Sequence, residues 1–255
     1  MKNEVWKKKS LIWDFAISDL KNRYRNSVLG FVWTLLEPLF ILLVLYVVFT
    51  NIFKSSIEHF PLYLLLGLIM WNMFVRGTQL ALNSIHSRGQ VLSQIHIPPE
   101  IPSISSSLTS LFMLTFEMIV FAIFLVVFHF LPPITAIILP LIIGLEFILV
   151  LGISLPLSVL NVRFRDTQFI WTVIIQAGFF LTPVFYKIDI LPKQVQNILV
   201  FSPMVQILNF AHDAMLYGTL PTSENIVIAI GTTFVILLIG YAVFRRLSHR
   251  IIEEL

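Results

Sequence analysis

Residues 134–160 read ITAIILPLIIGLEFILVLGISLPLSVL, an apolar run of 27 residues in which Glu146 is the one charged side chain. A helix rises 1.5 Å per residue, so about 20 apolar residues cross the hydrocarbon core of a membrane, which is about 30 Å thick. The run is long enough to span a bilayer, and we interpret it as a transmembrane helix.

Five further apolar stretches repeat this pattern and divide the chain into seven polar pieces. They are residues 31–53, 61–83, 108–131, 169–185 and 226–244. Residues 169–185 are marginal in length, and the others fit the requirement. The chain has 255 residues, of which 57% are hydrophobic and 12% charged, as expected for a bundle that faces lipid. We predict an all-α polytopic membrane protein with six transmembrane helices, forming a single domain over residues 1–255.

The basic residues lie almost entirely on one side of these six stretches. Of the 17 Lys and Arg, only Lys54, Lys187 and Lys193 fall on the other side. The remaining 14 are Lys2, Lys7, Lys8, Lys9, Lys21, Arg23, Arg25, Arg76, Arg88, Arg163, Arg165, Arg245, Arg246 and Arg250. Because cytoplasmic loops carry the excess of basic residues, both termini are predicted to be cytoplasmic. The net charge of +3 at this surface favours anionic lipid headgroups as neighbours and not nucleic acid.

The N-terminal piece, residues 1–27, has the pattern of a helix that lies on the membrane surface. Its apolar residues recur at helical spacing, with charged residues off the stripe. The stripe consists of Trp13, Ala16, Ile17, Leu20 and Tyr24. An interfacial amphipathic helix is the favoured interpretation, and a cytoplasmic helix packed on a partner protein is the alternative.

Residues 187–223 contain two apolar segments that are too short to cross a membrane. Pro192 opens the first, and Ser202-Pro203 opens the second, with Ser as the cap and Pro at the first helical position. A helical stripe follows, made of Met204, Ile207, Leu208, Ala211 and Met215. We predict a re-entrant helical hairpin on the outer side, and the short lengths argue against a seventh and an eighth span.

The polar piece between the second and third spans, residues 85–103, is predicted to be a cytoplasmic loop. Its three prolines, Pro98, Pro99 and Pro102, end any helix there and leave room for a short one over residues 88–95.

The sequence lacks the residue patterns of an enzyme. It has no Cys, no G-x-x-x-x-G-K-[ST] motif, no metal spacing among its six His and no paired loop carboxylates. We therefore expect no catalytic residues, no cofactor and no metal, and an energy source on a separate subunit.

Four ionisable residues lie within the predicted spans: Glu37, Arg76, Glu117 and Glu146. Glu37 and Arg76 are expected to pair or to reach the inner interface, whereas Glu117 and Glu146 lie deeper. Structural or interfacial roles are favoured for them over proton coupling.

In the second span, Trp71 stands next to Asn72 at the middle of the helix. The pair suggests a surface that faces protein or a channel. Simple packing between helices is at least as consistent with each residue taken alone.

Several segments together resemble a known family. Residues 23–33 (RYRNSVLGFVW), followed by Leu36-Glu37-Pro38, resemble the opening of type-2 ABC exporter permeases for polysaccharides, in particular the O-antigen export permeases. Residues 63–68 (YLLLGL) and 181–186 (LTPVFY) match the family in the same order. Ser202-Pro203 stands where the family usually has Asn-Pro, and residues 95–100 (IHIPPE) lack the basic residues that the family tends to place around this proline.

The resemblance implies a homodimer in the bacterial inner membrane, with a cytoplasmic ATP-binding subunit on each copy and a polyprenyl-pyrophosphate-linked glycan as substrate. The coupling helix that contacts the ATPase would be Arg88, Gly89, Gln90, Val91, Leu92, Ser93, Gln94 and Ile95. The inner rim and substrate channel would include Arg23, Arg25, Trp33, Glu37, Trp71 and Asn72. The outer gate would include Pro183, Tyr186 and Pro203.

Other functions fit parts of the sequence. A permease of the same architecture could carry teichoic acid, capsule, a drug or a simple lipid. A proton-coupled carrier would need functional membrane carboxylates, and an enzyme acting on polyprenyl lipids would need the acidic loop clusters that the sequence lacks.

Overall fold

The computed structural model describes residues 2–23, 25, 27–30, 32–51, 57–89 and 97–248, and this described part is helical, without β-strands. The long helices are α1 (Lys2–Arg23), α2 (Val32–Asn51), α3 (Phe60–Ser87), α5 (Glu100–Val127), α6 (Leu139–Arg163), α7 (Thr167–Leu181) and α10 (Ser223–Ser248). Shorter elements are the 3₁₀ turns η1 (Ile134–Ile138) and η2 (Ile188–Ile190), the helices α8 (Lys193–Leu199) and α9 (Pro203–His212), and the π-helix η3 (Asp213–Tyr217).

Five helical segments of the described chain are long and apolar enough to cross a membrane, and they coincide with five of the predicted spans. They are Val32–Thr50, Phe60–Ser87, Glu100–Val127, Ile134–Arg163 and Ser223–Ser248. The stretch 169–185 forms α7, which has only 15 residues and a length of about 22 Å. The helix ends because Thr182 adopts an extended conformation before Pro183, as residues preceding proline prefer.

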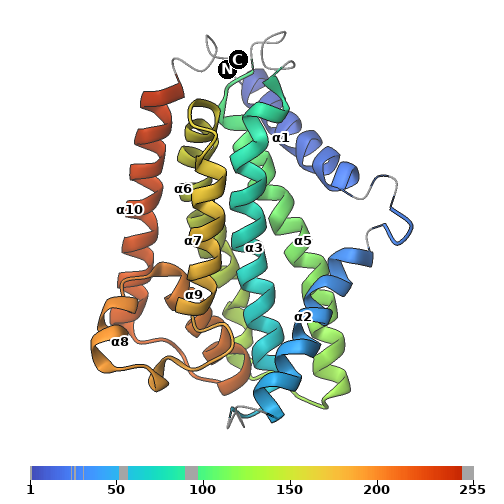
Figure 1. Cartoon of the computed structure of the whole chain (residues 1–255), viewed down its shortest axis with the longest axis vertical. Coiled ribbons are helices and arrows are strands. Elements are labelled where there is room, and N and C mark those ends of the chain that lie inside the picture. The colour runs from blue at the N-terminus through green and yellow to red at the C-terminus, as the bar shows by residue number, and fades with distance from the viewer. Residues whose placement is uncertain are drawn as a thin grey trace.

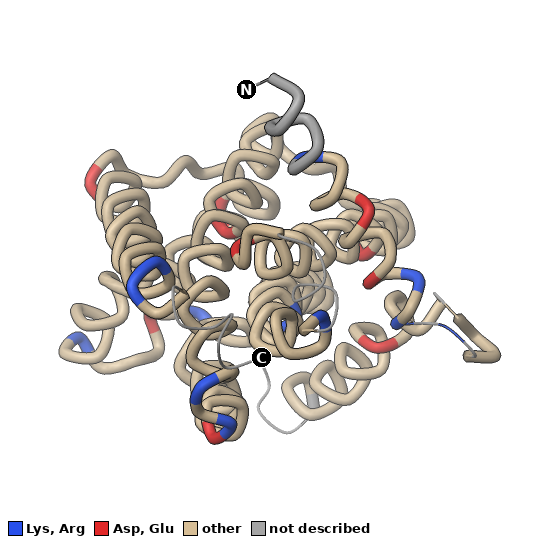
Figure 2. The backbone as a smooth tube through the Cα atoms, turned by 90° about the horizontal axis from the view of Figure 1, so that it is seen from above, with Lys and Arg blue, Asp and Glu red and all other residues tan. Residues whose placement is uncertain are grey.

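The helices run side by side around α3. Figure 1 shows α1, the turn between α6 and α7 and the C-terminal end of α10 at one end of the bundle, with α8 and α9 at the other. In its most apolar window α3 is 83% buried, against 17% for α2 and for α10. Figure 2 looks along the bundle and shows that charged residues occupy little of the tube. The helix at the centre thus contacts most of the others, and α2 and α10 present apolar surface to the outside.

The turn before α5 is shorter than predicted. The helix begins at Glu100, and Pro102 lies in its first turn, where the missing N–H of proline costs no helical hydrogen bond. The third span was predicted to start at residue 108, so α5 extends eight residues further towards the N-terminus.

The segment from α8 to η3 is sharply bent. Lys193–Leu199 and Pro203–Tyr217 meet at an angle of 99°, and Pro192 and Ser202 precede the two helices as predicted. The Ser202 side chain makes no capping hydrogen bond. All five residues of the predicted stripe are buried: Met204, Ile207, Leu208, Ala211 and Met215. The two-helix arrangement is confirmed, and its re-entry into the membrane stays a prediction.

Two glycines bring α6 and α10 into backbone contact. A Cβ atom on Gly240 would lie 1.9 Å from the carbonyl oxygen of Gly152, and a Cβ on Gly152 would lie 2.9 Å from the backbone of Leu237. Small residues of this kind let membrane helices approach closely and gain dispersion energy. Because neither glycine has a side chain, the backbones of α10, the last predicted span, and α6, the fourth, can lie in direct contact.

Replacing Gly240 tests this contact. In the Gly240→Ala variant the added methyl group must push the helices apart, and we expect a loss of about 1–3 kcal/mol in the free energy of unfolding. Gly231, on the same helix, has nothing within 4 Å of its Cβ position. The matched Gly231→Ala control should therefore be neutral or stabilising by up to about 1 kcal/mol. Unfolding of the detergent-solubilised protein measures both, and equal stability of the two variants contradicts the contact.

Candidate transport site

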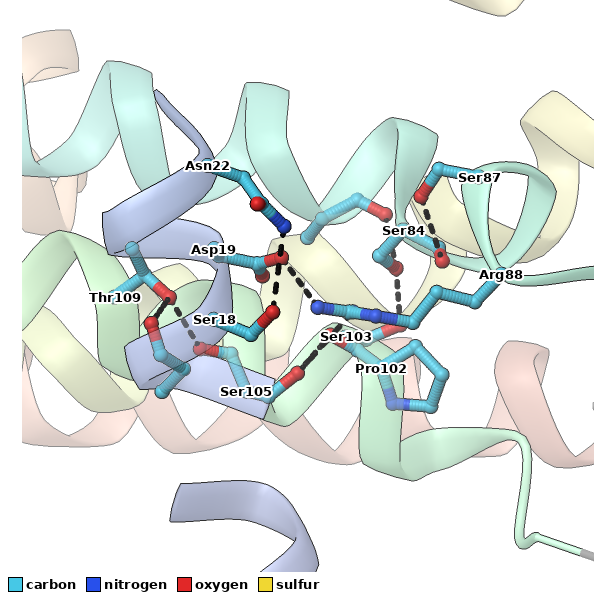
Figure 3. A network of polar contacts seen from close by, with 12 residues as sticks. Ser18, Asp19, Asn22, Ser84, Ser87, Arg88, Pro102, Ser103, Ser105 and Thr109 are labelled. Carbon is cyan, nitrogen blue, oxygen red and sulfur yellow. Dashed lines mark hydrogen bonds and ion pairs between the residues drawn. The ribbon is translucent and has the colours of Figure 1, made fainter. Parts of the chain in front are cut away.

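At the end of the bundle where α1 lies, an ion pair joins α1 to the residue that follows α3. Arg88 Nη2 bonds Asp19 Oδ1, Arg88 Nη1 lies 3.4 Å from Ser105 Oγ, and the guanidinium sits 4.5 Å from the centre of the Phe15 ring. Figure 3 shows Arg88 between α1 and α5, with Asp19 turned towards it. Arg88 and Asp19 are 13% and 25% exposed. The first residue of the predicted coupling helix is therefore fixed to α1.

Hydroxyl groups line the contacts of α5 at this end. Ser103 Oγ donates to Ser158 Oγ on α6 over 2.7 Å and lies 3.4 Å from Ser84 Oγ on α3. Thr109 Oγ1 donates to the carbonyl oxygen of Ala16 on α1 over 3.2 Å. Ala16 is buried there, so one face of α1 packs on α5.

Only part of the predicted coupling helix can be placed. Arg88 and Gly89 belong to the described chain, and Gln90, Val91, Leu92, Ser93, Gln94 and Ile95 lie outside it. Tyr24, the last residue of the predicted stripe on α1, also lies outside it. The interfacial position of α1 stays a prediction.

Halfway along the bundle, Arg76 on α3 pairs with two carboxylates. Its Nη2 lies 3.0 Å from Glu37 Oε2 on α2, and its Nη1 bonds Glu117 Oε1 on α5. Arg76 is 6% exposed and Glu117 is fully buried, whereas Glu37 is 48% exposed. The predicted pairing of Glu37 with Arg76 is confirmed. Glu117, for which a structural or interfacial role was favoured, is the second and more buried partner.

Two further polar groups within the spans lack partners. Neither carboxylate oxygen of Glu146, buried on α6, has a hydrogen bond in the described chain, and the same holds for Asn72 Nδ2 on α3. Trp71, beside Asn72, is 6% exposed and packs on α7, where a Cβ on Gly178 would lie 3.1 Å from the indole ring. Within one copy Trp71 therefore packs between helices, and its exposure to a channel stays a prediction.

The residues predicted for the inner rim are exposed. Arg23 ends α1, Arg25 lies in the following turn, and both are exposed. Trp33, 45% exposed, and Glu37 lie one helical turn apart on the same face of α2. Phe40 and Val44 continue this face and are 58% and 57% exposed.

At the end of the bundle where α8 and α9 lie, the segment after α7 is bound to the start of α3. Tyr63 Oη donates to the carbonyl oxygen of Tyr186 over 2.8 Å, and His212 Nε2 lies 3.0 Å from the carbonyl oxygen of Tyr63. The Tyr63 and His212 rings stack at 3.7 Å. A Cβ on Gly67 would lie 2.5 Å from the carbonyl oxygen of Val184, so only glycine admits this backbone.

The three predicted gate residues lie at this end of the bundle and are buried. Pro183 and Tyr186 belong to the segment that Tyr63 binds, and Pro203 occupies the first position of α9. Tyr63, His212 and Asp19 were not among the predicted site residues. The position of His212 inside an apolar helix could have indicated its role. Tyr63 is the first residue of the stretch 63–68 (YLLLGL), which resembles the family. Nothing local to Asp19 indicated its partner.

Breaking the Arg76 cluster tests its energetic role. Arg76→Met leaves the buried Glu117 without a counter-charge, and we expect a loss of about 3–5 kcal/mol in the free energy of unfolding. The double variant Arg76→Met/Glu117→Leu should regain most of this loss, because no isolated charge then remains buried. Glu37→Gln should cost at most about 1 kcal/mol, since Glu37 is half-exposed. A double-mutant cycle with no coupling between Arg76 and Glu117 contradicts this assignment.

Comparison with known proteins agrees with this architecture. The chain is 28% identical to an O-antigen export system permease protein of Klebsiella pneumoniae over 93% of its own length and 92% of the relative's. It is 25% identical to the protein of the same description from Myxococcus xanthus, over 99% and 98% of the two lengths. A polysialic acid transport protein of Escherichia coli is 24% identical over 90% of each chain. The profile of the ABC-2 type transporter family matches residues 11–216, and the chain therefore belongs to that family of membrane transporter subunits.

Proposed function

We propose that this chain forms the transmembrane channel of an ATP-driven exporter that moves lipid-linked polysaccharide of the O-antigen type out of the cytoplasm across the bacterial inner membrane. The observation that carries the proposal is the similarity to O-antigen export permeases over more than nine-tenths of the chain. Five helical segments of the described chain that are long and apolar enough to cross a membrane, together with the lack of a nucleotide-binding motif in the sequence, support it.

The distribution of charge supports an orientation with both termini in the cytoplasm. The described basic residues of α1, of the turn between α6 and α7 and of the end of α10 lie at one end of the bundle, whereas Lys187 and Lys193 lie at the other. The positive-inside rule assigns the more basic end to the cytoplasm. The bent segment from α8 to η3 is then on the outer side.

Two copies would enclose the channel. The face of α2 that carries Trp33, Glu37, Phe40 and Val44 is exposed in one copy, and it connects the inner rim at Arg23 and Arg25 with the middle of the bundle. We assign this face to the channel. Basic residues at its inner end supply charge-assisted contacts to the pyrophosphate group of the substrate. Trp71 and Asn72 remain part of the proposed channel, reached once α7 moves away from α3.

The coupling to the ATPase would start at Arg88. Because Arg88 is paired with Asp19, a displacement of residues 88–95 by the ATP-binding subunit is passed to α1 as well as to α3. The α1 helix is thereby part of the coupling device and not only a membrane anchor.

Capsule polysaccharide is the second candidate substrate. The similarity to a polysialic acid transport protein favours it. The higher identity to O-antigen permeases places it second.

Gene deletion tests the proposed function. Cells without this chain should lose the polysaccharide from their surface and accumulate the lipid-linked glycan at the cytoplasmic leaflet, because synthesis continues while export stops. Detection of surface polysaccharide with a specific antibody, and extraction of the lipid-linked precursor, measure the two effects. Complementation by the intact gene is the control. Normal surface polysaccharide in the deletion strain contradicts the proposal.

A charge swap tests whether Arg88 acts through its ion pair with Asp19 or through a direct contact with the ATPase. Arg88→Asp places two carboxylates together, and we expect at least a tenfold loss of permease-stimulated ATP hydrolysis, because like charges at this distance repel. Adding Asp19→Arg restores an ion pair of opposite direction and should recover most of the stimulation. Failure of this rescue would mean that Arg88 contacts the ATPase itself. Hydrolysis by the reconstituted complex of both subunits is the measurement.

A further inference from the structure

A polar pocket of about 530 Å³ lies at the outer end of the chain, within the range of about 300–1,000 Å³ that is typical of ligand sites. Its wall is built from the start of α3, from the turn around η2 and from the stretch that runs from α9 to the start of α10. Its polar lining side chains include Lys187 and Asp189 around η2, Asn209 on α9, Asp213 and Tyr217 on η3, and Asn225 on α10.

The polar groups of this wall are available to a ligand. Within the described chain, the side-chain amides of Asn209 and Asn225 and the carboxylates of Asp189 and Asp213 make no hydrogen bond to other residues. An amide offers both donors and acceptors, and a carboxylate offers acceptors. The set is complementary to a ring of hydroxyl groups, each of which donates and accepts.

The wall is held in shape by contacts outside the pocket. Asp213 and Tyr217 lie at the two ends of the π-helix η3, an element that is rare and is frequent at functional sites. Thr135 Oγ1 donates to the carbonyl oxygen of Ala214 over 2.7 Å, which ties η3 to η1. Gly218 ends the π-helix with φ +69°, and a Cβ there would lie 3.3 Å from Pro133. The geometry of Asp213 and Tyr217 is therefore preset by the fold.

The charges of the pocket select among the parts of the proposed substrate. Two carboxylates, Asp189 and Asp213, face one ammonium group, Lys187, whose Nζ lies 4.3 Å from the centre of the Tyr217 ring. Since the carboxylates outnumber the ammonium group, a pyrophosphate is repelled, whereas a neutral or amino sugar is not.

We propose that this pocket binds a neutral or amino sugar unit of the exported polymer as the polymer leaves the channel. The proposal rests on the proposed function, because it takes the polysaccharide as the cargo. It assigns sugar recognition to the outer end of each subunit, separate from the contacts that receive the pyrophosphate at the inner rim.

Binding to the purified chain tests the proposal. The probe is the polysaccharide released by mild acid from the lipopolysaccharide of the cells that carry this gene, and saturation-transfer NMR on the full chain in detergent detects it. The double variant Asn209→Ala/Asn225→Ala removes two hydrogen-bonding side chains of the pocket, one on α9 and one on α10, and we expect about tenfold weaker binding. The matched control is Asn197→Ala, an exposed amide on α8 at the same end but outside the pocket, which should bind as the wild type does.

Three results would overturn the proposal: absence of binding by the wild type, an equal loss in Asn197→Ala, and displacement of the polysaccharide by inorganic pyrophosphate. If the double variant does not fold, as judged by its unfolding temperature, Asp213→Asn replaces it, because this change preserves shape and removes one charge. The deletion strain distinguishes a failure of the sugar-binding proposal from a failure of the proposed export function. Lost surface polysaccharide together with no binding refutes the pocket alone, whereas retained surface polysaccharide refutes the function.

Discussion

An arginine within a bundle that faces lipid must have its charge compensated inside the protein, because no water is at hand to do so. Arg76 finds this compensation in Glu37 and Glu117, and in doing so it joins α2, α3 and α5 at mid-height. The arrangement also bears on the source of energy. Two of the three membrane carboxylates are engaged by a cation, and no hydrogen bond within the described chain connects Glu146 to them. A proton relay would need such connections.

The burial of α3 gives the bundle its second constraint. Each end of this helix is bound to a different part of the chain: Tyr63 to the segment after α7, and Ser84 to α5. One contact is made by the rigid aromatic side chain of Tyr63 and the other by the short side chain of Ser84, and both side chains have little freedom to adjust. A helix held in this way moves as one body, and the elements bound to it move with it.

Hydropathy predicted most of this fold, because lipid forces the backbone of a spanning segment to bond within its own helix. The start of α5 was missed since serines made the region look polar. Those serines bond back along the helix: Ser105 Oγ donates to the carbonyl oxygen of Pro102, and Ser107 Oγ to that of Ser103. Their hydroxyl groups form hydrogen bonds within the same helix, and an average of residue hydropathies does not take such bonds into account. The end of α7 was overestimated, as apolar residues continue past Thr182 although the helix does not.

The site was less predictable than the fold for a related reason. Arg76 and His212 stand out as polar residues in apolar helices, and Asp19 is one of several charged residues of α1, but their partners lie 41, 149 and 69 positions away. These pairs form only when the right helices pack side by side. That packing depends on close backbone contacts such as those of Gly67 with Val184 and of Gly240 with Gly152.

The same contacts bear on how the two ends of the proposed exporter communicate. From Tyr63 to Ser87, α3 spans about 36 Å without a break, and Arg88 follows directly. A helix of this length transmits a displacement along its axis better than a bending motion, because its backbone hydrogen bonds run along that axis. Since the C-terminal end of α3 is tied to α1 and its N-terminal end to the segment around Tyr186, an axial shift of α3 reaches both. The buried Arg76 cluster opposes such a shift at mid-height, so α2 and α5 must follow. The movement would then involve the proposed channel face of α2 together with the proposed outer gate.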